Sequence, residues 1–405
     1  MTEPPDLVPG RTVMRQRSLR SANLGLVMRA VASMDEPSRA DIAAHTGMTR
    51  STVSRLADEL IAGGLVHELD PISGQRGRPA TPLVVARGTL AAVGCEMGVG
   101  HLTARVVDLA GQVLAHRHQP ADLAGRPATE SLARLAGLVR DVAGRSGATT
   151  LVGVGLAVPG LVSPDADEVL KAPNLGWTEL RPGPLLARAG LAPATGPLAL
   201  INEADAAAVT LAEDLPGRPS GRDGFLYVSG EVGVGSAAVL RGEVTTGRHG
   251  WAGELGHVCL DPAGERCGCG AMGCLETFAG RRAVLRAAGV DDSDTLLARL
   301  ADGDPRTVEA VRRAGTALGV AVAGALNLLD LQEVVLGGFL AELGDHVVPA
   351  VESELRERVL SHRYAPVRVG LEDGGEWRAA TGSAHRVLSR VINDPAGWLD
   401  AAAAS

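Results

Sequence analysis

The apolar residues of the first 88 positions recur at helical spacing and then form two short runs. Three helices followed by two strands are the elements of a winged helix-turn-helix, so we expect residues 1–88 to form one small domain. The expected helices cover residues 24–33, 38–47 and 48–61, and the expected strands cover 64–69 and 82–86.

Capping residues mark the helix ends in this segment. Ser38 suits an N-cap and Asp41 completes an approximate capping box, while Gly47 ends that helix with a short turn. Thr49 is placed to cap the following helix. The apolar residues that the two helices share as a core are Ile42, Ala43, Val53, Leu56 and Leu60.

Arginine and small hydroxyl side chains occupy the outer face near the start of the helix over 48–61. Such side chains read base edges and bind phosphates when a helix enters the major groove. The connection between the two strands contains Gln75-Arg-Gly-Arg-Pro79, whose arginines suit a narrow minor groove. An ordinary helical hairpin with a polar loop is the alternative, but the helix pair, its caps and the wing occur in order and favour DNA binding. The candidate DNA-binding residues are Arg50, Ser51, Thr52, Ser54, Arg55, Arg76 and Arg78.

From residue 89 onward the expected order of elements occurs twice: three strands are followed by alternating helices and strands. The first copy has strands over 90–98, 101–107 and 112–116, a helix over 129–143, strands over 151–158 and 197–201, and a helix over 204–212. The second copy has strands over 225–229, 235–240 and 243–246, then helices over 306–329, 347–359 and 377–391 around strands at 334–336 and 367–371.

This duplication predicts an α/β body of two lobes that enclose a cleft, similar to the actin-like, ribonuclease H-like ATPase fold. We expect the body to span residues 89–405, with lobe one at about 89–200 and lobe two at about 201–385. The last helix is expected to return to lobe one.

Composition and charge agree with two domains of different character. The chain has 405 residues, too many for one ordinary core, and a net charge of −8. Residues 1–88 hold 11 Arg and 9 Asp plus Glu, a balance of +2, which leaves −10 for the remainder. A basic segment on an acidic body supports an anionic partner. There is no run of about 18 apolar residues and no apolar leader, so we expect no membrane span and a cytoplasmic protein with reduced thiols.

One His and three Cys fall within 18 positions, in Glu254-Leu-Gly-His257, Cys267-Gly-Cys269 and Gly273-Cys274-Leu-Glu276. In a reducing compartment, clustered cysteines favour metal binding over disulfides, and a His with three thiolates suits a closed tetrahedral Zn²⁺ site. The alternative is three small buried thiols. The two carboxylates in the window are good acceptors for sugar hydroxyls, so the window predicts a structural zinc that supports a polyol pocket.

With Pro173-Asn174, Asn202-Glu203-Ala-Asp205 and Gly337-Gly338, these motifs make the chain resemble the ROK family of repressors, open reading frames and sugar kinases. The resemblance covers residues from about 20 to 390 and points to the winged-helix branch that contains the xylose and N-acetylglucosamine repressors. It implies zinc ligands at His257, Cys267, Cys269 and Cys274. It implies sugar-binding residues at Asn174, Asn202, Glu203, Glu254, His257 and Glu276, with Glu203 at the position of the family's catalytic base.

His257 would then serve twice, with one ring nitrogen on zinc and the other on a sugar hydroxyl. For Asn174 the alternative is a turn-forming role after Pro173.

The loops that hold phosphate in the family's kinases are altered in this chain. The first loop of such kinases reads Asp-x-Gly-x-Thr, but here it reads Glu96-Met-Gly98-Val-Gly100. The second usually reads Gly-Thr-Gly-x-Gly, but here Glu231 and Val232 stand where phosphate and close backbone approach would be. The base position holds Glu203 in place of Asp. We therefore expect no catalytic residue and no kinase activity.

The expected function is that of a sugar-responsive DNA-binding regulator, a repressor of carbohydrate uptake or catabolism genes. Its expected partners are operator DNA, a small sugar effector and further copies of itself, as a homodimer or a dimer of dimers. One alternative is an ATP-dependent sugar kinase, similar to glucokinase or N-acetylhexosamine kinase, with a DNA-binding appendage. Another is a DNA-binding protein whose body only dimerises. The effector, the operator sequence and the sign of regulation stay open.

Overall fold

The structure is a computed structural model that describes residues 16–71, 81–163, 167–191, 198–372 and 375–402. It divides into two compact units, Met1–Ala86 with Ser389–Ser405 and Arg87–Leu388. The sequence analysis kept everything after residue 88 in the body, whereas the structure groups the C-terminal segment with the first unit. None of the helices in the described ranges combines the length and apolar character that crossing a bilayer demands.

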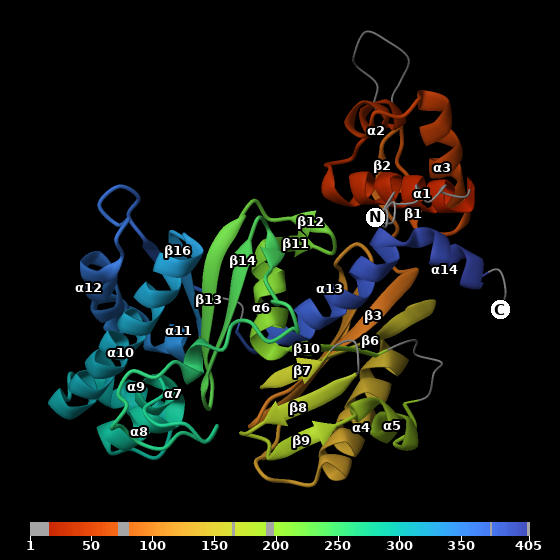
Figure 1. The fold of residues 1–405 in the computed structure, drawn as a ribbon. Helices are drawn as coiled ribbons and strands as arrows, with labels where there is room; N and C mark the ends of the chain where they lie inside the picture. The colour runs from red at the N-terminus through yellow and green to blue at the C-terminus, as the bar shows by residue number, and fades with distance from the viewer. Residues whose placement is uncertain (1–15, 72–80, 164–166, 192–197, 373–374, 403–405) are drawn as a thin grey trace, which may run out of the picture. The chain divides into compact units, whose positions relative to one another are not determined.

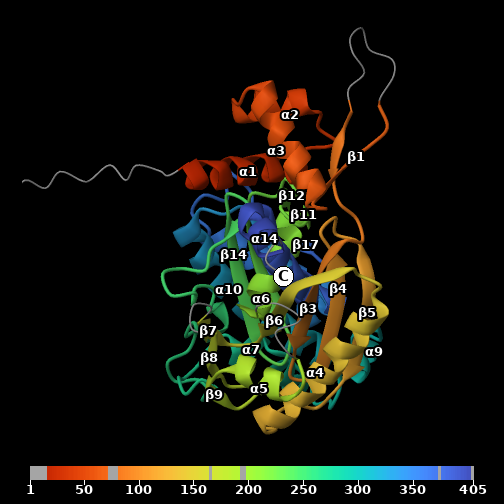
Figure 2. The same ribbon diagram turned by 90° about the vertical axis from the view of Figure 1, so that its right-hand side faces the viewer.

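The first unit has the expected order of three helices and two paired strands (Figure 2). The Ser38 side chain accepts a bond from the backbone of Asp41, and the Asp41 carboxylate accepts one from the Ser38 backbone at 2.9 Å. Gly47 adopts a φ of +72° and Thr49 caps the next helix, so the predicted turn is confirmed. The elements are α1 (Gln16–Ser33), α2 (Arg39–Thr46), α3 (Arg50–Ala62), β1 (Val66–Glu68) and β2 (Leu83–Val85). All five predicted core residues are buried.

A C-terminal helix that the sequence analysis missed, α14 (Pro395–Ala402), completes this unit by packing on α1. The Ser21 hydroxyl donates to Asp394 at 3.3 Å. Leu399 lies against the end of α3, because a Cβ on Gly63 would stand 2.0 Å from the Leu399 Cδ2 atom. The C-terminal segment therefore contributes to the core of the unit that also contains α1–α3.

The second unit contains two five-stranded sheets, and their strands follow the same order and directions (Figure 1). In each sheet three antiparallel strands are followed by two strands parallel to the first. The first sheet contains β3 (Leu90–Met97), β4 (His101–Asp108), β5 (Val113–Pro120), β6 (Thr150–Val158) and β10 (Leu198–Asn202). The second contains β13 (Gly224–Gly230), β14 (Val234–Leu240), β15 (Glu243–Val244), β16 (Glu333–Gly338) and β17 (Arg368–Leu371). The predicted duplication and the two-lobed actin-like fold are confirmed.

Helices accompany both sheets, and each lobe has its own apolar core. In the first lobe these are α4 (Ala128–Arg145) and α5 (Pro182–Arg188), while α6 (Glu203–Ala212) follows β10. In the second they are α7 (Glu276–Ala279), α8 (Arg281–Ala288), α9 (Ser293–Ala301), α10 (Pro305–Leu329), α11 (Phe339–Leu343) and α12 (Val348–Arg358). The small strands are β7 (Leu161–Ser163), β8 (Glu168–Ala172), β9 (Trp177–Leu180), β11 (Glu213–Leu215) and β12 (Arg218–Pro219).

Helix α13 (Arg378–Asn393) begins in the second unit and ends in the first. Its first half packs closely on β3 and β6. A Cβ on Gly94 would lie 1.8 Å from the Ala380 carbonyl oxygen, and one on Gly155 would lie 2.1 Å from the Ser383 carbonyl oxygen. Glycine is needed at both positions because the helix backbone lies directly on the strands.

Candidate functional site

The loop between His257 and α7 gathers the four expected metal ligands. A tight turn carries Cys267 and Cys269, because the Cys267 backbone donates to Ala271 at 2.8 Å and the Gly270 backbone donates to Cys267 at 2.9 Å. Gly273 precedes Cys274 with a φ of +64°, and a Cβ there would stand 1.7 Å from a backbone oxygen. The backbone path of the loop therefore brings the three thiols back to His257.

The ligand atoms of His257, Cys267, Cys269 and Cys274 all lie within 4.8 Å of one another. His257 Nδ1 is 3.8 Å from Cys267 Sγ, and Cys269 Sγ is 3.7 Å from Cys274 Sγ. A tetrahedron with Zn–S bonds of about 2.3 Å has edges of about 3.8 Å. The four residues thus form a cluster that fits a metal ion, and all five cysteines of the chain have free thiols.

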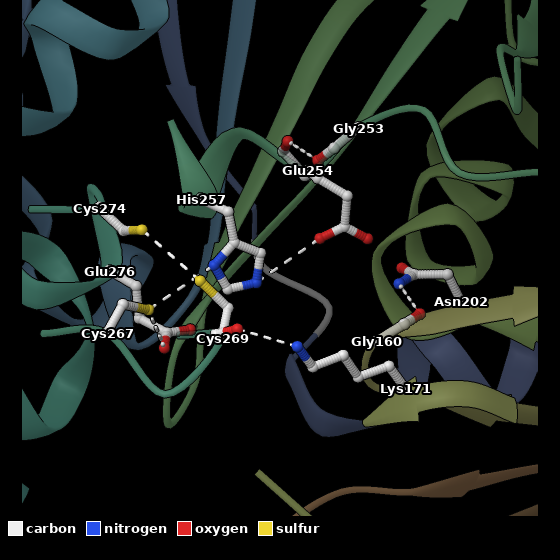
Figure 3. Close-up of polar contacts among 11 residues, drawn as sticks. Gly160, Lys171, Asn202, Gly253, Glu254, His257, Cys267, Cys269, Cys274 and Glu276 are labelled. Atoms are coloured by element: carbon white, nitrogen blue, oxygen red, sulfur yellow. Dashed lines mark hydrogen bonds and ion pairs between the residues drawn. The ribbon is translucent and has the colours of Figure 1, made fainter. Parts of the chain in front are cut away.

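The ring of His257 lies between this cluster and a carboxylate (Figure 3). Its Nε2 atom is 3.8 Å from Glu254 Oε2, on the side opposite Nδ1. A metal on Nδ1 would leave the proton on Nε2 and hold the ring in place. Glu276 lies beside the cluster as well, with Oε1 at 3.6 Å from Cys267 Sγ.

The side chain of Lys171 also supports the loop, as Figure 3 shows, by donating from Nζ to the Cys269 carbonyl at 2.8 Å. The sequence analysis gave this residue no role. It lies on β8, one of the short strands that the sequence pattern did not reveal. The metal loop is thus held from the first lobe as well as the second.

A cavity of about 640 Å³ lies beside this cluster, between the two lobes. Gly233 allows Asn174 and Glu276 to approach each other, since a Cβ on this glycine would lie 3.2 Å from Asn174 Nδ2 and 1.8 Å from Glu276 Oε2. Asn202 caps α6 and donates to the Gly160 carbonyl at 2.9 Å. The structure brings all six expected sugar-binding residues to the wall of this cavity, namely Asn174, Asn202, Glu203, Glu254, His257 and Glu276.

Two ion pairs stand in the altered loops of the cavity. His101 Nε2 is 3.2 Å from Glu96 Oε1, and Arg281 NH2 is 3.4 Å from Glu231 Oε2. Sequence reasoning identified both glutamates but neither cation, because His101 belongs to a different strand and Arg281 to a helix that the pattern did not reveal. Arg281 therefore partly compensates the charge of Glu231.

Burial and mutual repulsion change the acidity of these groups. Burial, with added repulsion from Glu96 and Glu231, raises the pKa of Glu203 to about 8. Burial raises the pKa of Glu231 to about 7 against the opposing effect of Arg281. Burial alone would lower the pKa of His101, but the Glu96 carboxylate raises it to about 9. The carboxyl groups of Glu203 and Glu231 are therefore partly protonated near neutral pH.

The candidate DNA-binding residues at the start of α3 are accessible. Arg50, Ser51 and Arg55 are exposed, while Thr52 and Ser54 are partly exposed. The Ser51 and Thr52 hydroxyls lie 3.0 and 2.9 Å from that of Thr49 in the helix cap. Arg50 and Arg55 form no ion pair with any residue in the described ranges, so both guanidinium groups are available to a ligand. Arg76 and Arg78 lie outside the described residues.

Comparison with known proteins identifies the family. A sequence profile of the ROK family matches residues 92–389, which covers most of the chain and all of the cavity. The chain belongs to the ROK family. The IclR helix-turn-helix domain matches residues 23–70, which contain α2 and α3.

Relatives of this ROK protein include regulators that match along nearly their full length. A putative xylose repressor from Caldicellulosiruptor sp. (strain Rt8B.4) is 27% identical over 93% of this chain and 98% of the relative. The DNA-binding transcriptional dual regulator NagC of Escherichia coli (strain K12) is 27% identical over 84% of this chain and 86% of the relative.

Two solved structures place the body among both regulators and enzymes. A ROK family transcriptional regulator, described as a homologue of the E. coli MLC protein, superposes with a TM-score of 0.76 and 26% identity, covering 94% of this chain and 98% of that one. A ROK hexokinase from Thermus thermophilus has a TM-score of 0.59 and 28% identity, covering 76% of this chain and 99% of that one. The ROK body alone therefore does not decide between regulation and catalysis.

Proposed function

We propose that this protein is a sugar-responsive repressor of carbohydrate uptake or catabolism genes. The observation that carries the proposal is the joining of a winged helix-turn-helix, with exposed Arg50 and Arg55, to a cavity lined by the full set of expected sugar-binding residues. The relatives reported above are named as a putative xylose repressor and a DNA-binding transcriptional dual regulator, which supports a regulatory role.

The cavity offers a sugar several acceptors and one oriented donor. Glu254 and Glu276 are acceptors for hydroxyl groups, and the Nε2 atom of His257 is the donor once Nδ1 is held by a metal. A structural Zn²⁺ on His257, Cys267, Cys269 and Cys274 would supply that hold and would order the loop. Sugar binding and metal binding would then share one residue.

Response to the sugar requires that the two conformational states of the body differ in sugar affinity. A ligand that contacts both lobes favours the state in which its contacts are complete. The chain joins the body to the DNA-binding unit twice, between Ala86 and Arg87 and within α13, and both connections are covalent routes for such a change. A homodimer with two such units would recognise a pseudo-palindromic operator.

A titration of the protein's own upstream DNA by fluorescence anisotropy, at fixed salt and with a panel of common sugars, tests this function. A shift in DNA affinity of about tenfold with one sugar, equivalent to about 1.4 kcal/mol of coupling, supports the proposal. Tight DNA binding that no sugar changes would favour a protein whose body only dimerises.

A sugar kinase is the second candidate because the body superposes on a ROK hexokinase. Glu231 weighs against it, since its carboxylate, paired with Arg281, stands in the loop that is expected to hold phosphate in a kinase. A coupled assay with ATP and a panel of hexoses distinguishes a kinase from a regulator. Turnover well above background would show an enzyme, and absence of turnover with intact DNA binding agrees with a regulator.

A further inference from the structure

Acidic side chains outnumber basic ones in the wall of the cavity. Among the lining residues that the structure describes, six glutamates stand against one arginine and three histidines. With all six carboxyl groups ionised, the described lining is negative even when every histidine carries a proton, and Glu203 and Glu231 reach that state above neutral pH. The acidic members are Glu203, Glu231, Glu254, Glu276, Glu342 and Glu372, and the basic ones are His101, His118, His257 and Arg281.

The single arginine of the wall is already engaged. Arg281 NH2 lies 3.4 Å from Glu231 and 3.9 Å from Glu342, so its charge is shared between two carboxylates. His101 is likewise engaged with Glu96. An incoming phosphate would have to compete with these internal acids for Arg281 and His101, and His118, whose ring centroid lies 5.2 Å from that of His101, is a further histidine of the described wall.

Glu203 lies at the first turn of α6 and makes no hydrogen bond or ion pair with any residue in the described part of the chain. It lies within the field of Glu96 and Glu231, which together with burial accounts for its raised pKa of about 8. A neutral hydroxyl can bind such a carboxyl as donor or acceptor, and an ammonium group would be attracted to it. A phosphate dianion would add charge to a site that already disfavours its own.

We propose that this cavity selects its effector by charge: it accepts sugars with free hydroxyl or amino groups and rejects their phosphate esters, with Glu203 and Glu231 as the selecting residues. The inference rests on the proposed sugar response and names the class of effector.

Calorimetric titration of the full-length, zinc-loaded protein with matched pairs tests the selection. The pairs are glucose with glucose 6-phosphate, and N-acetylglucosamine with its 6-phosphate, while glucosamine serves as a cationic analogue of glucose. The parent sugar that binds is expected to bind at least about tenfold more tightly than its ester, given two or more carboxylates within several ångströms of the phosphate. Glucosamine is expected to bind at least as tightly as glucose.

Glu231→Gln is the decisive variant, because it removes one carboxylate and leaves Arg281 with only the more distant Glu342. The difference in affinity between parent sugar and ester is expected to shrink by about tenfold in this variant. In Glu203→Gln it should shrink only above about pH 8, where the Glu203 carboxyl is ionised. Glu243→Gln is the matched control, since Glu243 is exposed on β15 of the same lobe and lies outside the cavity wall. This control variant should leave the difference in affinity between parent sugar and ester unchanged.

The outcomes separate the inference from the function on which it rests. An ester that binds as tightly as its parent overturns the charge selection and leaves the sugar response intact. If Glu231→Gln and Glu243→Gln reduce the affinity difference between sugar and ester equally, the charge selection does not arise from the cavity wall. If neither parents nor esters bind, the proposed sugar response itself fails. Circular dichroism melting of each variant shows whether a lost effect reflects unfolding.

Discussion

Replacing Cys267 with serine should damage metal binding, loop stability and sugar affinity together. Between Val258 and Met272 the loop has 15 residues, of which Cys267 alone is buried. The segment therefore has almost no apolar core, and its order depends on the four ligands together with its backbone hydrogen bonds and the bond from Lys171. Structural zinc contributes about 10–16 kcal/mol in zinc-finger peptides, so an even division gives about 3 kcal/mol for each ligand.

The effect on sugar binding follows from the shared residue. Without a metal on Nδ1, the His257 ring loses its fixed orientation and its Nε2 donor is no longer assured. The loss of one hydrogen bond of about 1 kcal/mol, together with the entropy of holding the ring, lowers sugar affinity about tenfold. DNA binding without sugar should persist, because α1–α3 belong to the other unit.

Cys259→Ser is the matched control, since it makes the same chemical change in the same loop at an exposed cysteine outside the cluster. Metal content, melting temperature and sugar calorimetry would be measured for both variants. The control should retain one metal per chain and the parent affinity. If Cys267→Ser lowered stability but left sugar affinity unchanged, the double role of His257 would be wrong. If it kept its metal, the ligand set itself would be wrong.

Three further predictions concern other parts of the molecule. Arg55→Ala should weaken operator binding and reduce the slope of log affinity against log salt by about 1, as anisotropy at several salt concentrations would show; unchanged affinity removes Arg55 from the interface. Because the pKa of Glu203 is raised from 4.5 to about 8, the folded protein binds more protons than the unfolded chain, and this group makes stability fall as pH rises through that window. The free energy of unfolding of Glu203→Gln should therefore rise relative to that of the parent between pH 5 and about pH 8, with no further rise above pH 8. Denaturant titrations in which the two proteins differ by the same amount at every pH would contradict the raised pKa. Gly94→Ala should destabilise the second unit by about 2 kcal/mol or more, because the added methyl group would clash with Ala380. The control is Gly144→Ala, on an exposed turn of α4 with open space around it, which should be neutral or stabilising by up to about 1 kcal/mol. Equal melting temperatures of the two variants would refute the packing argument.

Local signals predicted the first unit well. Ser38, Gly47 and Thr49 act within a few residues of themselves, so the caps and turn could be read directly from the sequence. The long periodic segments of the body, such as those that form β6 and α10, were equally clear. The metal cluster was predictable because its four ligands lie within 18 positions.

Features that depend on contacts between distant segments were not predictable in this way. β7–β9 are strands of three to five residues whose pairing leaves no periodic pattern. The partner of Glu231 is 50 residues away on a short helix, and nothing local marks Arg281 as that partner. The place of α14 could not be predicted either, since it packs on α1, which is more than 350 residues earlier in the chain.

The discontinuous make-up of the first unit has a consequence for synthesis of the chain. Helices α1–α3 emerge from the ribosome early, but α14, which packs on α1 and on the end of α3, emerges only after the whole body has been translated. The DNA-binding unit therefore cannot complete its core during translation of the body. Chains that stop short of residue 395 would carry a helix-turn-helix with uncovered apolar surface and no completed core, which favours their removal by proteases over their binding to DNA.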